Sequence, residues 1–365
     1  EATLGETIAL AAATKAVTGA PTQKEQDLSW LDNYVFVDAE NKYFNLRTSK
    51  VETALKFNNM NGRYIDGKSG AKFSASKVAS DEGTVDYADA LAYLPFTEER
   101  VVTIEGKVFV NIFAPTSVPA RAEAFTADGE DYCQRIIDHC TMLCGSEEEG
   151  SLLLQWLAHN AQHPGRKLLW SPLIQGPEGI GKSYLGELLK ASLGQVNVGT
   201  VSASAVSSNF NGWASGVAVN ILEELRIAGK NRHEALNALK PLISDNTIQV
   251  TRKGLDAYVT QNCTNYLAFT NYSDAIPIGL TDRRWWICAS PIRALSDIPN
   301  HAEYFETLFD GLRDHRAEVS LWLATYPITE EFLALKTAPM SEDKEAMILT
   351  EESNTYGLTE TRDAF

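Results

Sequence analysis

Apolar residues follow a helical period in some segments of the chain and form short strand-like runs in others. Residues 131–144 and 151–162 place apolar side chains three and four positions apart, which predicts two consecutive helices, and Pro164-Gly165 ends the second. From residue 168 onward, short apolar runs alternate with helical segments, a pattern typical of an α/β layer built on a largely parallel sheet. Residues 302–335 return to the helical period.

The first third of the chain mixes both patterns. Strand-like runs flank polar turns twice, which predicts two hairpins: residues 34–37 with 43–46, and residues 101–104 with 108–113. A segment rich in Ala and Leu at 86–94 predicts a helix between them. We therefore expect residues 28–127 to form a mixed α+β accessory module, and no motif in it indicates an activity.

Both ends of the chain are polar. Residues 1–27 are rich in small and polar side chains, which predicts a linker or disordered segment, and residues 340–365 predict a polar acidic tail. The sequence begins at Glu1 without methionine, so we expect a fragment or a processed product of a longer protein.

Composition narrows the class of protein. The 365 residues are 44% hydrophobic and 22% charged, the ordinary mixture of a globular protein with two or three domains. A net charge of −16 excludes a general polyanion binder, so a nucleic acid would need a local positive patch. The longest apolar runs, such as 217–222, are far shorter than the ~20 residues of a membrane span, so we expect no membrane partner. Five cysteines without a dense pattern favour reduced thiols and a cytoplasmic location.

A glycine-rich loop follows the first apolar run of the α/β part. The strand-like run 168–175 leads into Gly176-Pro177-Glu178-Gly179-Ile180-Gly181-Lys182-Ser183, and residues 184–193 have the composition of a helix. This is the G-x-x-x-x-G-K-[ST] pattern in its strand, loop, helix context. Glycines let backbone N–H groups turn toward phosphates, Lys182 neutralises the β and γ oxygens, and the Ser183 hydroxyl coordinates Mg²⁺. The loop therefore predicts a site for ATP and Mg²⁺, against the alternative of a chance glycine-rich turn.

Two adjacent acids end a second predicted strand. Residues 217–222 are apolar apart from Asn220, and Glu223 and Glu224 follow directly. Ligands bind at the carboxyl edge of parallel sheets, so these acids should lie beside the glycine-rich loop. We assign Glu223 to the Mg²⁺ ion and Glu224 to the attacking water, whereas paired glutamates at an ordinary helix start are the alternative.

Polar residues also flank the later predicted strands. The strand 265–270 ends at Asn271, whose amide can contact the γ-phosphate or orient the water, although asparagine after a strand is often only a turn residue. Arg283 and Arg284 precede the apolar run 285–288. Arginine stabilises the charge that develops during phosphoryl transfer when a neighbouring subunit supplies it, and a solvated surface pair is the alternative.

The order and compactness of these motifs resemble the superfamily 3 helicases of viruses and plasmids, which are AAA+-like motors. The resemblance is closer to the helicase part of phage and poxvirus-type primase-helicases, and it covers residues 131–291. It implies a P-loop AAA+-like α/β fold in which the glycine-rich loop is Walker A, the two glutamates are Walker B and Asn271 is sensor 1. It also makes Arg284 the arginine finger, with Arg283 as the reserve candidate.

The same resemblance implies a domain order and an assembly. Residues 128–166 become a helical collar-like segment, 167–300 the ATPase core with a central, mostly parallel sheet, and 301–339 a C-terminal helical segment. ATP is then hydrolysed between subunits of a ring-shaped homo-oligomer, a hexamer. A covalently linked primase or polymerase domain upstream is a further expectation.

The resemblance further implies a hairpin that contacts DNA in the pore of the ring. Residues 246–251 fit its rising strand, 252–255 its tip and 257–260 its return. Arg252 and Lys253 at the tip can engage backbone phosphates of single-stranded DNA without reading sequence. An exposed basic turn without a role is the alternative.

A group of cysteines and histidines invites a zinc interpretation. Cys133, His139, Cys140 and Cys144 are close in sequence, but they lack a paired C-x₂-C. Cys140 and Cys144 fall on the apolar face of their predicted helix, so we expect them to pack in the core.

Taken together, the sequence predicts an ATP-dependent DNA helicase module of a phage or plasmid-type replication protein. It would translocate as a ring on single-stranded or forked DNA. Two alternatives keep the same pocket: an ATP-dependent DNA loader or packaging-type AAA+ motor, and a replisome scaffold that binds ATP without hydrolysing it. A nucleoside kinase is a third, which would need neither Asn271 nor the hairpin.

Overall fold

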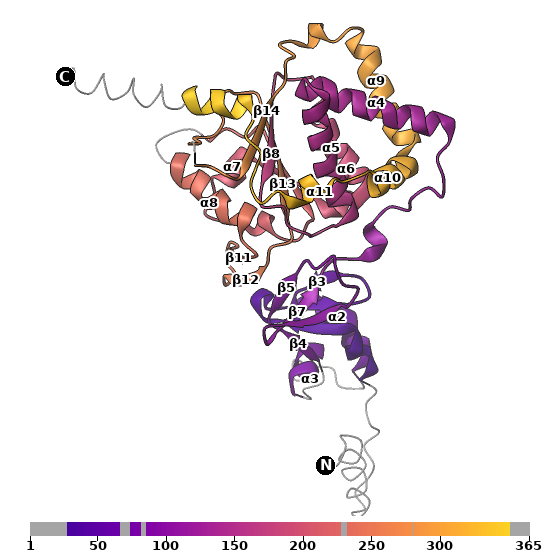
Figure 1. Cartoon of the computed structure of the whole chain (residues 1–365). Helices are drawn as coiled ribbons and strands as arrows, with labels where there is room; N and C mark the ends of the chain where they lie inside the picture. Colours follow the sequence, from indigo (N-terminus) through magenta and orange to yellow (C-terminus); the bar gives the residue numbers. More distant parts are fainter. Residues whose placement is uncertain (1–27, 66–73, 82–84, 228–231, 280, 351–365) are drawn as a thin grey trace, which may run out of the picture. The chain divides into compact units, whose positions relative to one another are not determined.

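The computed structural model describes residues 28–65, 74–81, 85–227, 232–279 and 281–350 (Figure 1). The chain divides into two compact units, one of Glu1–Phe36 and Lys42–Tyr87 and the other of Val37–Asn41 and Ala88–Phe365. The predicted linker at 1–27 lies outside the described residues. Among the described residues, no helix is both long and apolar enough to cross a membrane.

The smaller unit is built on a four-stranded sheet of order β3-β2-β1-β4. Its elements are β1 (Tyr34–Val37), β2 (Lys42–Asn45), β3 (Lys50–Glu52), β4 (Asp86–Ala88), α2 (Ala54–Asn61) and α3 (Ala75–Asp81). Tyr43 of β2 stacks on Phe57 of α2 with ring centroids 3.8 Å apart, which joins the sheet to the helix. β1 and β2 are hydrogen-bonded neighbours, so the first predicted strand pair is confirmed.

The predicted helix at 86–94 is wrong. The segment forms β4 and then β5 (Ala90–Ala92), and Ala88, Ala90 and Ala92 are all buried, with the period of two that a strand gives. Asp89 fixes the extended path, because its N–H donates to the Val108 carbonyl at 2.8 Å and its carboxylate accepts from the Val108 N–H at 2.6 Å. Pairing with distant residues therefore overrides the helix propensity of the alanines.

The larger unit contains a five-stranded parallel sheet of order β14-β8-β13-β10-β9. Its strands are β8 (Ser171–Gln175), β9 (Val198–Ser202), β10 (Val219–Glu223), β13 (Asn265–Thr270) and β14 (Trp285–Ala289). All six residues of β13, the central strand, are buried, as expected for a parallel sheet covered on both faces. The predicted parallel sheet and the apolar strands that build it are confirmed.

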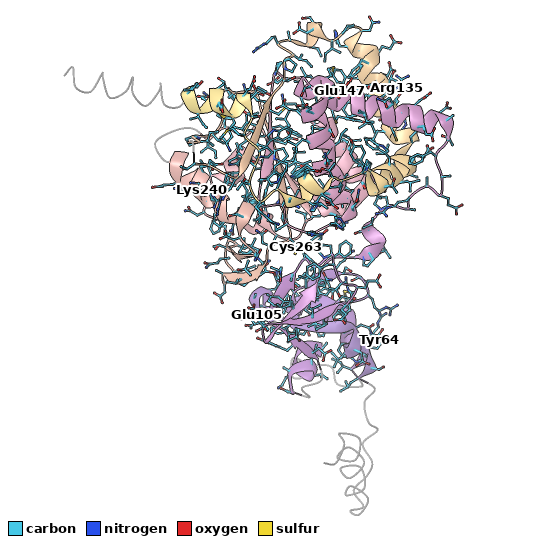
Figure 2. The ribbon with its side chains drawn as sticks, viewed as in Figure 1. Tyr64, Glu105, Arg135, Glu147, Lys240 and Cys263 are labelled. Carbon is cyan, nitrogen blue, oxygen red and sulfur yellow. The ribbon has the colours of Figure 1, made fainter. Side chains whose placement is uncertain are left out.

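Helices cover both faces of this sheet (Figure 1). One face carries α4 (Ala127–Cys144), α5 (Glu147–Gln162), α6 (Tyr184–Leu193) and α10 (Arg316–Thr325), with α9 (His301–Asp314) and α11 (Glu330–Ala334) nearby; the other carries α7 (Ala203–Val206) and α8 (Arg232–Ser244). Adjacent residues of β14 face opposite layers, because Trp285 belongs to the apolar cluster that contains Leu236 of α8 and Trp286 to the one that contains Trp156 of α5. Side chains fill the space between the sheet and these helices (Figure 2).

Two small sheets complete the larger unit. One has the order β5-β7-β6 with β6 (Val101–Ile104) and β7 (Lys107–Asn111) antiparallel, and the other pairs β11 (Thr247–Val250) with β12 (Tyr258–Gln261). Glu105 and Gly106 at the β6–β7 turn have φ angles of 50° and 79°, the conformation of a tight hairpin turn. The strand pairs predicted at 101–113 and at 246–260 are therefore confirmed, whereas the DNA contact of the second stays a prediction.

The first part of the predicted polar tail is an ordered helix in the structure. Residues 342–350 are helical, and Met347 and Ile348 are buried against the sheet layer that contains β14. The Ser341 hydroxyl donates to the Ile287 carbonyl at 2.5 Å, and the Asp343 carboxylate accepts from the Ala289 N–H at 2.6 Å. This segment therefore covers β14, an edge strand of the sheet, with hydrogen bonds that the acidic composition did not predict.

The cysteines are buried and free of disulfides. Cys140 is fully buried and Cys144 is 3% exposed, and both belong to the main apolar cluster, so their predicted place in the core is confirmed. Burial raises the pKa of Cys133 to about 12.

Candidate functional site

The loop of residues 176–183 joins the carboxyl end of β8 to α6, the context that the motif requires. Gly179 and Gly181 have φ angles of 82° and 93°, a region that residues with a Cβ rarely adopt. A Cβ on Gly181 would also lie 2.5 Å from Cε1 of His139. Ile180 is fully buried and anchors the loop in the core. The loop is thus held in one shape that requires glycine.

Lys182 is turned inward on this loop. Its side chain is only 9% exposed, and its ammonium group donates to the carbonyl oxygens of Gly176 at 2.5 Å and Pro177 at 2.7 Å. Burial lowers the pKa of Lys182 to about 8, although the carboxylates of Glu178 and Glu223 oppose this shift. A cation poised in this way gains stability from any further negative charge placed beside it.

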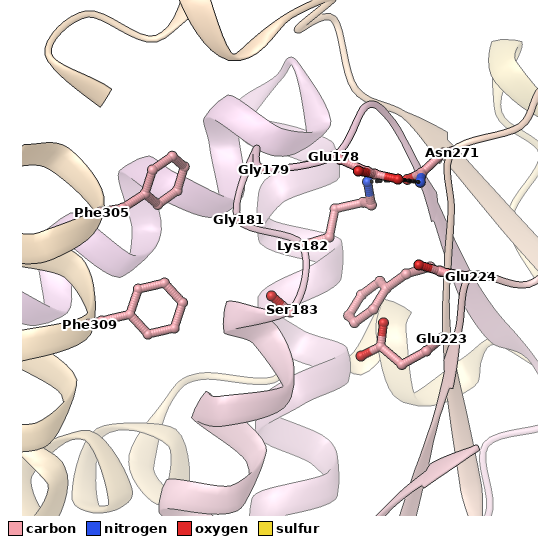
Figure 3. A pocket seen from close by; sticks show the side chains of 11 residues that line it. Glu178, Gly179, Gly181, Lys182, Ser183, Glu223, Glu224, Asn271, Phe305 and Phe309 are labelled. Carbon is pink, nitrogen blue, oxygen red and sulfur yellow. Dashed lines mark hydrogen bonds between the residues drawn. The ribbon is translucent and has the colours of Figure 1, made fainter. Parts of the chain in front are cut away.

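Asn271 connects the loop to the end of β13. Its Oδ1 accepts a hydrogen bond from the Lys182 ammonium at 2.9 Å, and its Nδ2 donates to Oε1 of Glu178 at 3.3 Å. The sensor 1 candidate therefore contacts two residues of the glycine-rich loop directly (Figure 3).

The two acids lie at the end of β10, beside the loop. Glu223 is the last residue of the strand, and Glu224 follows with a φ of 50°, an uncommon conformation that turns the chain away from the sheet. Burial raises the pKa of Glu223, Glu224 raises it further, and Lys190 and Lys182 oppose this shift. A cation bound between Glu223 and the Ser183 hydroxyl would relieve this excess of negative charge.

One pocket of about 280 Å³ brings these residues together (Figure 3). Its lining consists of Glu178, Gly179, Gly181, Lys182, Ser183, Glu223, Glu224, Phe269, Asn271, Phe305 and Phe309. Sequence reasoning missed the three phenylalanines. Phe305 and Phe309 lie one turn apart on α9, and this spacing ordinarily indicates a core-facing helix stripe, so no local signal assigned them to the pocket.

The two arginines do not reach the pocket of their own chain. β14 runs parallel to β8, with Trp285 opposite Ser171 and Ala289 opposite Gln175. Arg283 and Arg284 therefore lie at the amino edge of the sheet and the loop at its carboxyl edge. In this structure, Nε of Arg284 donates to the Ser244 hydroxyl at 3.2 Å.

The two arginines differ in exposure. Arg284 is half-buried by its contact with α8, whereas Arg283 is exposed. Asp282 holds the turn, since its Oδ1 accepts from the backbone N–H groups of Arg284 at 2.9 Å and Trp285 at 3.1 Å. The buried Lys344 ammonium donates to the Asp282 carbonyl at 2.7 Å. Arg283 is thus the more accessible of the two finger candidates.

The hairpin tip presents one free cation rather than two. Arg252 forms an ion pair with Glu40, whose side chain is 5% exposed, and its guanidinium lies 5.0 Å from the ring centroid of Tyr258. Gly212 also packs against the Arg252 side chain. Lys253 at the same turn is exposed. The expectation of an Arg252 guanidinium directed at DNA therefore does not match this conformation.

A comparison with protein families assigns no activity to this site. The matching model covers residues 174–284 and is described as a family of unknown function (DUF5906). The matched segment begins two residues before the loop and contains the whole loop, both acids, Asn271 and both arginines.

A protein of a phage is among the known proteins to which this chain is similar. The chain is 24% identical over 278 residues to the DNA Primase-polymerase of Nitratiruptor phage NrS-1, a match that covers 72% of this chain and 35% of that protein. This chain thus spans about a third of the relative's length.

Solved structures extend the likeness to the fold. An apo structure of the NrS-1 C-terminal region has a TM-score of 0.65 at 18% identity, and the match covers 90% of this chain and 76% of that one. A second apo structure of the region, in the A form, has a TM-score of 0.64 at 18% identity, with 89% and 74% covered. The chain therefore shares the mixed α/β fold of that region and is similar to a phage replication protein.

Proposed function

We propose that this chain is the ATP-hydrolysing motor of a phage-type replication protein, a P-loop AAA+-like helicase module that acts on single-stranded DNA as a ring. The observation that carries the proposal is the convergence of Lys182, Ser183, Glu223, Glu224 and Asn271 on one pocket. These residues come from the loop after β8 and from the ends of β10 and β13, so the parallel sheet alone brings them together.

In this proposal, the triphosphate lies along the loop. The Lys182 ammonium turns from the carbonyl oxygens of Gly176 and Pro177 to the β and γ oxygens, which offer full negative charge. The oxygens of Ser183 and Glu223 are the hard donors that Mg²⁺ prefers, and the ion supplies neutralisation of phosphate charge when bound.

Hydrolysis follows from the remaining two residues. Glu224 accepts a proton from the water whose oxygen attacks the γ-phosphorus, the bond from that phosphorus to the β–γ bridging oxygen breaks, and ADP and inorganic phosphate leave. In this proposal Asn271 orients this water and relays phosphate release to the loop, and its hydrogen bonds to the Lys182 ammonium and to Glu178 support this role.

The proposed ring supplies what one chain lacks. Because Arg283 and Arg284 lie at the edge of the sheet opposite the loop, they can serve only a nucleotide held by another subunit. The tip cation Lys253, repeated around a ring, gives a local positive surface within a protein of net charge −16.

The proposal is tested by ATP hydrolysis with and without single-stranded DNA. We expect Lys182→Ala to abolish turnover, and Glu224→Gln to abolish turnover while ATP binding persists. Hydrolysis retained by Lys182→Ala would reject the loop as the site. ATP binding without any turnover in the wild-type protein would favour the scaffold alternative, and unwinding of a forked duplex separates a helicase from a loader.

A mixing experiment tests the trans arginine. Arg283→Ala and Arg284→Ala proteins should bind ATP, and the variant that lacks the finger should lose turnover. Mixing that variant with Glu224→Gln subunits should restore part of the turnover, since some interfaces then combine an intact loop with an intact arginine. Activity that is unchanged in both arginine variants would rule out this assembly.

A further inference from the structure

One wall of the pocket is aromatic, and neither the phosphate loop nor the acids account for it. Phe305 and Phe309 project from α9 toward the loop, on the far side of the loop from Glu223 and Glu224 (Figure 3). Phe309 is 41% exposed, an unusual position for a phenylalanine that lines a polar pocket.

The aromatic wall is fixed relative to the loop by a hydrogen-bonded chain through His139. Nδ1 of His139 lies 2.8 Å from the hydroxyl of Tyr304 on α9, and Nε2 lies 3.2 Å from the carbonyl oxygen of Gly181 in the loop. Burial lowers the pKa of His139 to about 4, so the ring is neutral at pH 7. Because a carbonyl oxygen only accepts, Nε2 donates to Gly181 and Nδ1 accepts from Tyr304.

A second set of contacts holds the same helix. The buried hydroxyl of Tyr132 donates to the carbonyl oxygen of Leu308 on α9 and lies 2.6 Å from the hydroxyl of Tyr184 on α6. The ring of Phe309 packs edge-on against Tyr184, with centroids 5.4 Å apart. The helix that carries the aromatic wall is thus joined to the helix that follows the loop by contacts within the protein.

The chemistry of the two ends of the pocket differs. Every polar side chain that lines it comes from the loop or from the ends of β10 and β13, whereas α9 contributes only the two phenyl rings. A ligand matched to this lining is anionic at one end and flat and aromatic at the other, which describes a nucleotide.

We infer that Phe305 and Phe309 form the surface on which the base of a nucleoside triphosphate stacks. This inference rests on the proposed function, because it takes the phosphates to lie on the loop. A phenyl face stacks on any base, and α9 adds no polar side chain to the pocket lining, so we expect the site to accept ATP and GTP with affinities within about tenfold.

The test compares two probes, ATP and inorganic triphosphate, each with Mg²⁺, by isothermal titration calorimetry, and GTP is titrated in the same way into the wild-type protein. Wild-type protein should bind ATP more tightly than triphosphate. Phe309→Ala should weaken ATP binding about 5- to 100-fold, the range of one lost stacking contact, and leave triphosphate binding unchanged. Phe309→Trp should retain ATP binding, and Phe96→Ala, which removes a phenylalanine that is 60% exposed elsewhere, is the matched control.

Four results would overturn the inference. If ATP binding is unchanged both in Phe309→Ala and in the double variant Phe305→Ala/Phe309→Ala, the pocket is a phosphate site without a base surface. An equal loss for both probes would mean that the rings only support the loop. Discrimination between ATP and GTP of 100-fold or more would require a polar group that reads the base. If neither probe binds the wild-type protein, the proposed nucleotide site fails, and the base surface fails with it.

Discussion

If the proposed nucleotide site is correct, the buried ammonium of Lys182 predicts a specific pH dependence of binding. Its pKa in the free protein is lowered to about 8, because desolvation outweighs the attraction of Glu178 and Glu223. A bound triphosphate places several negative charges beside the ammonium and raises this pKa again. Binding therefore favours the protonated lysine, and protons are taken up on binding wherever the free protein has begun to lose them.

The size of the effect follows from this pKa. With a pKa of about 8, Lys182 is about nine-tenths protonated at pH 7 and about one-tenth protonated at pH 9. The affinity is thus close to its full value at pH 7 and falls as the pH rises through 8, about tenfold between pH 7 and pH 9, which is about 1.4 kcal/mol. The triphosphate adds little to this change, because its last proton is lost near a pH of about 6, below this range.

Isothermal titration calorimetry measures both parts of this prediction. The dissociation constant at pH 7, 8 and 9 gives the loss of affinity, and titrations in two buffers of different ionisation enthalpy give the number of protons taken up. Lys182→Arg is the control, since a guanidinium keeps its proton throughout this range. A wild-type affinity that does not change from pH 7 to 9, or an equal loss in Lys182→Arg, would refute the reasoning.

Three further variants test other contacts. Lys253→Ala should weaken single-stranded DNA binding and lower the slope of log affinity against log salt by about 0.7 per subunit bound, which fluorescence anisotropy measures. Glu40→Gln should lower the free energy of unfolding by about 1–3 kcal/mol, less than the loss of a fully buried ion pair, because the Arg252 side chain is 25% exposed. The same variant should steepen the slope of log DNA affinity against log salt, since Arg252 gains access to DNA. Tyr132→Phe should lower the free energy of unfolding in urea by about 1–3 kcal/mol, because the buried hydroxyl of Tyr184 loses its partner.

Each variant has a matched control on the surface of the same unit. Lys107→Ala removes an exposed lysine from the β6–β7 hairpin and should leave the salt slope unchanged. Glu98→Gln and Tyr272→Phe alter an exposed carboxylate and a tyrosine that is 41% exposed, and both should leave the free energy of unfolding within about 0.5 kcal/mol of wild type. If Lys253→Ala shows the same salt slope as the wild type, the hairpin tip is not part of the DNA site.

The parts of the fold that the sequence predicted carry local signals. The loop could be located because its glycines, lysine and serine follow a strand and precede a helix. Each of these flanking elements can be predicted from a short stretch of sequence. The strands β10 and β13 are buried on both faces and therefore read as continuous apolar runs. The acids and Asn271 then follow from the rule that parallel strands end at one edge.

The parts that escaped prediction depend on contacts between distant residues. The segment at 86–94 has helix-forming alanines, yet pairing with β7 makes part of it a strand. Arg252 reads as a free cation at a turn, and only the folded chain brings Glu40 to it. Phe305 and Phe309 have ordinary helical spacing, and their place in the pocket follows from the packing of α9 near the loop. No window of sequence contains these pairings.

The arrangement of β8 and β14 bears on how subunits of the proposed ring would communicate. The loop leaves the carboxyl end of β8, and the arginine turn enters the amino end of β14, the strand hydrogen-bonded beside it. Lys344 holds the arginine turn through Asp282, and Ser341 and Asp343 hold the rest of β14. Both strands are buried in a covered sheet, so a local bend between the two ends would break several of these contacts. In the proposed ring, a change in how a subunit binds its own nucleotide would therefore move its arginines as part of the same rigid body. The neighbouring site would then respond to the rotation of a whole subunit rather than to the movement of one loop.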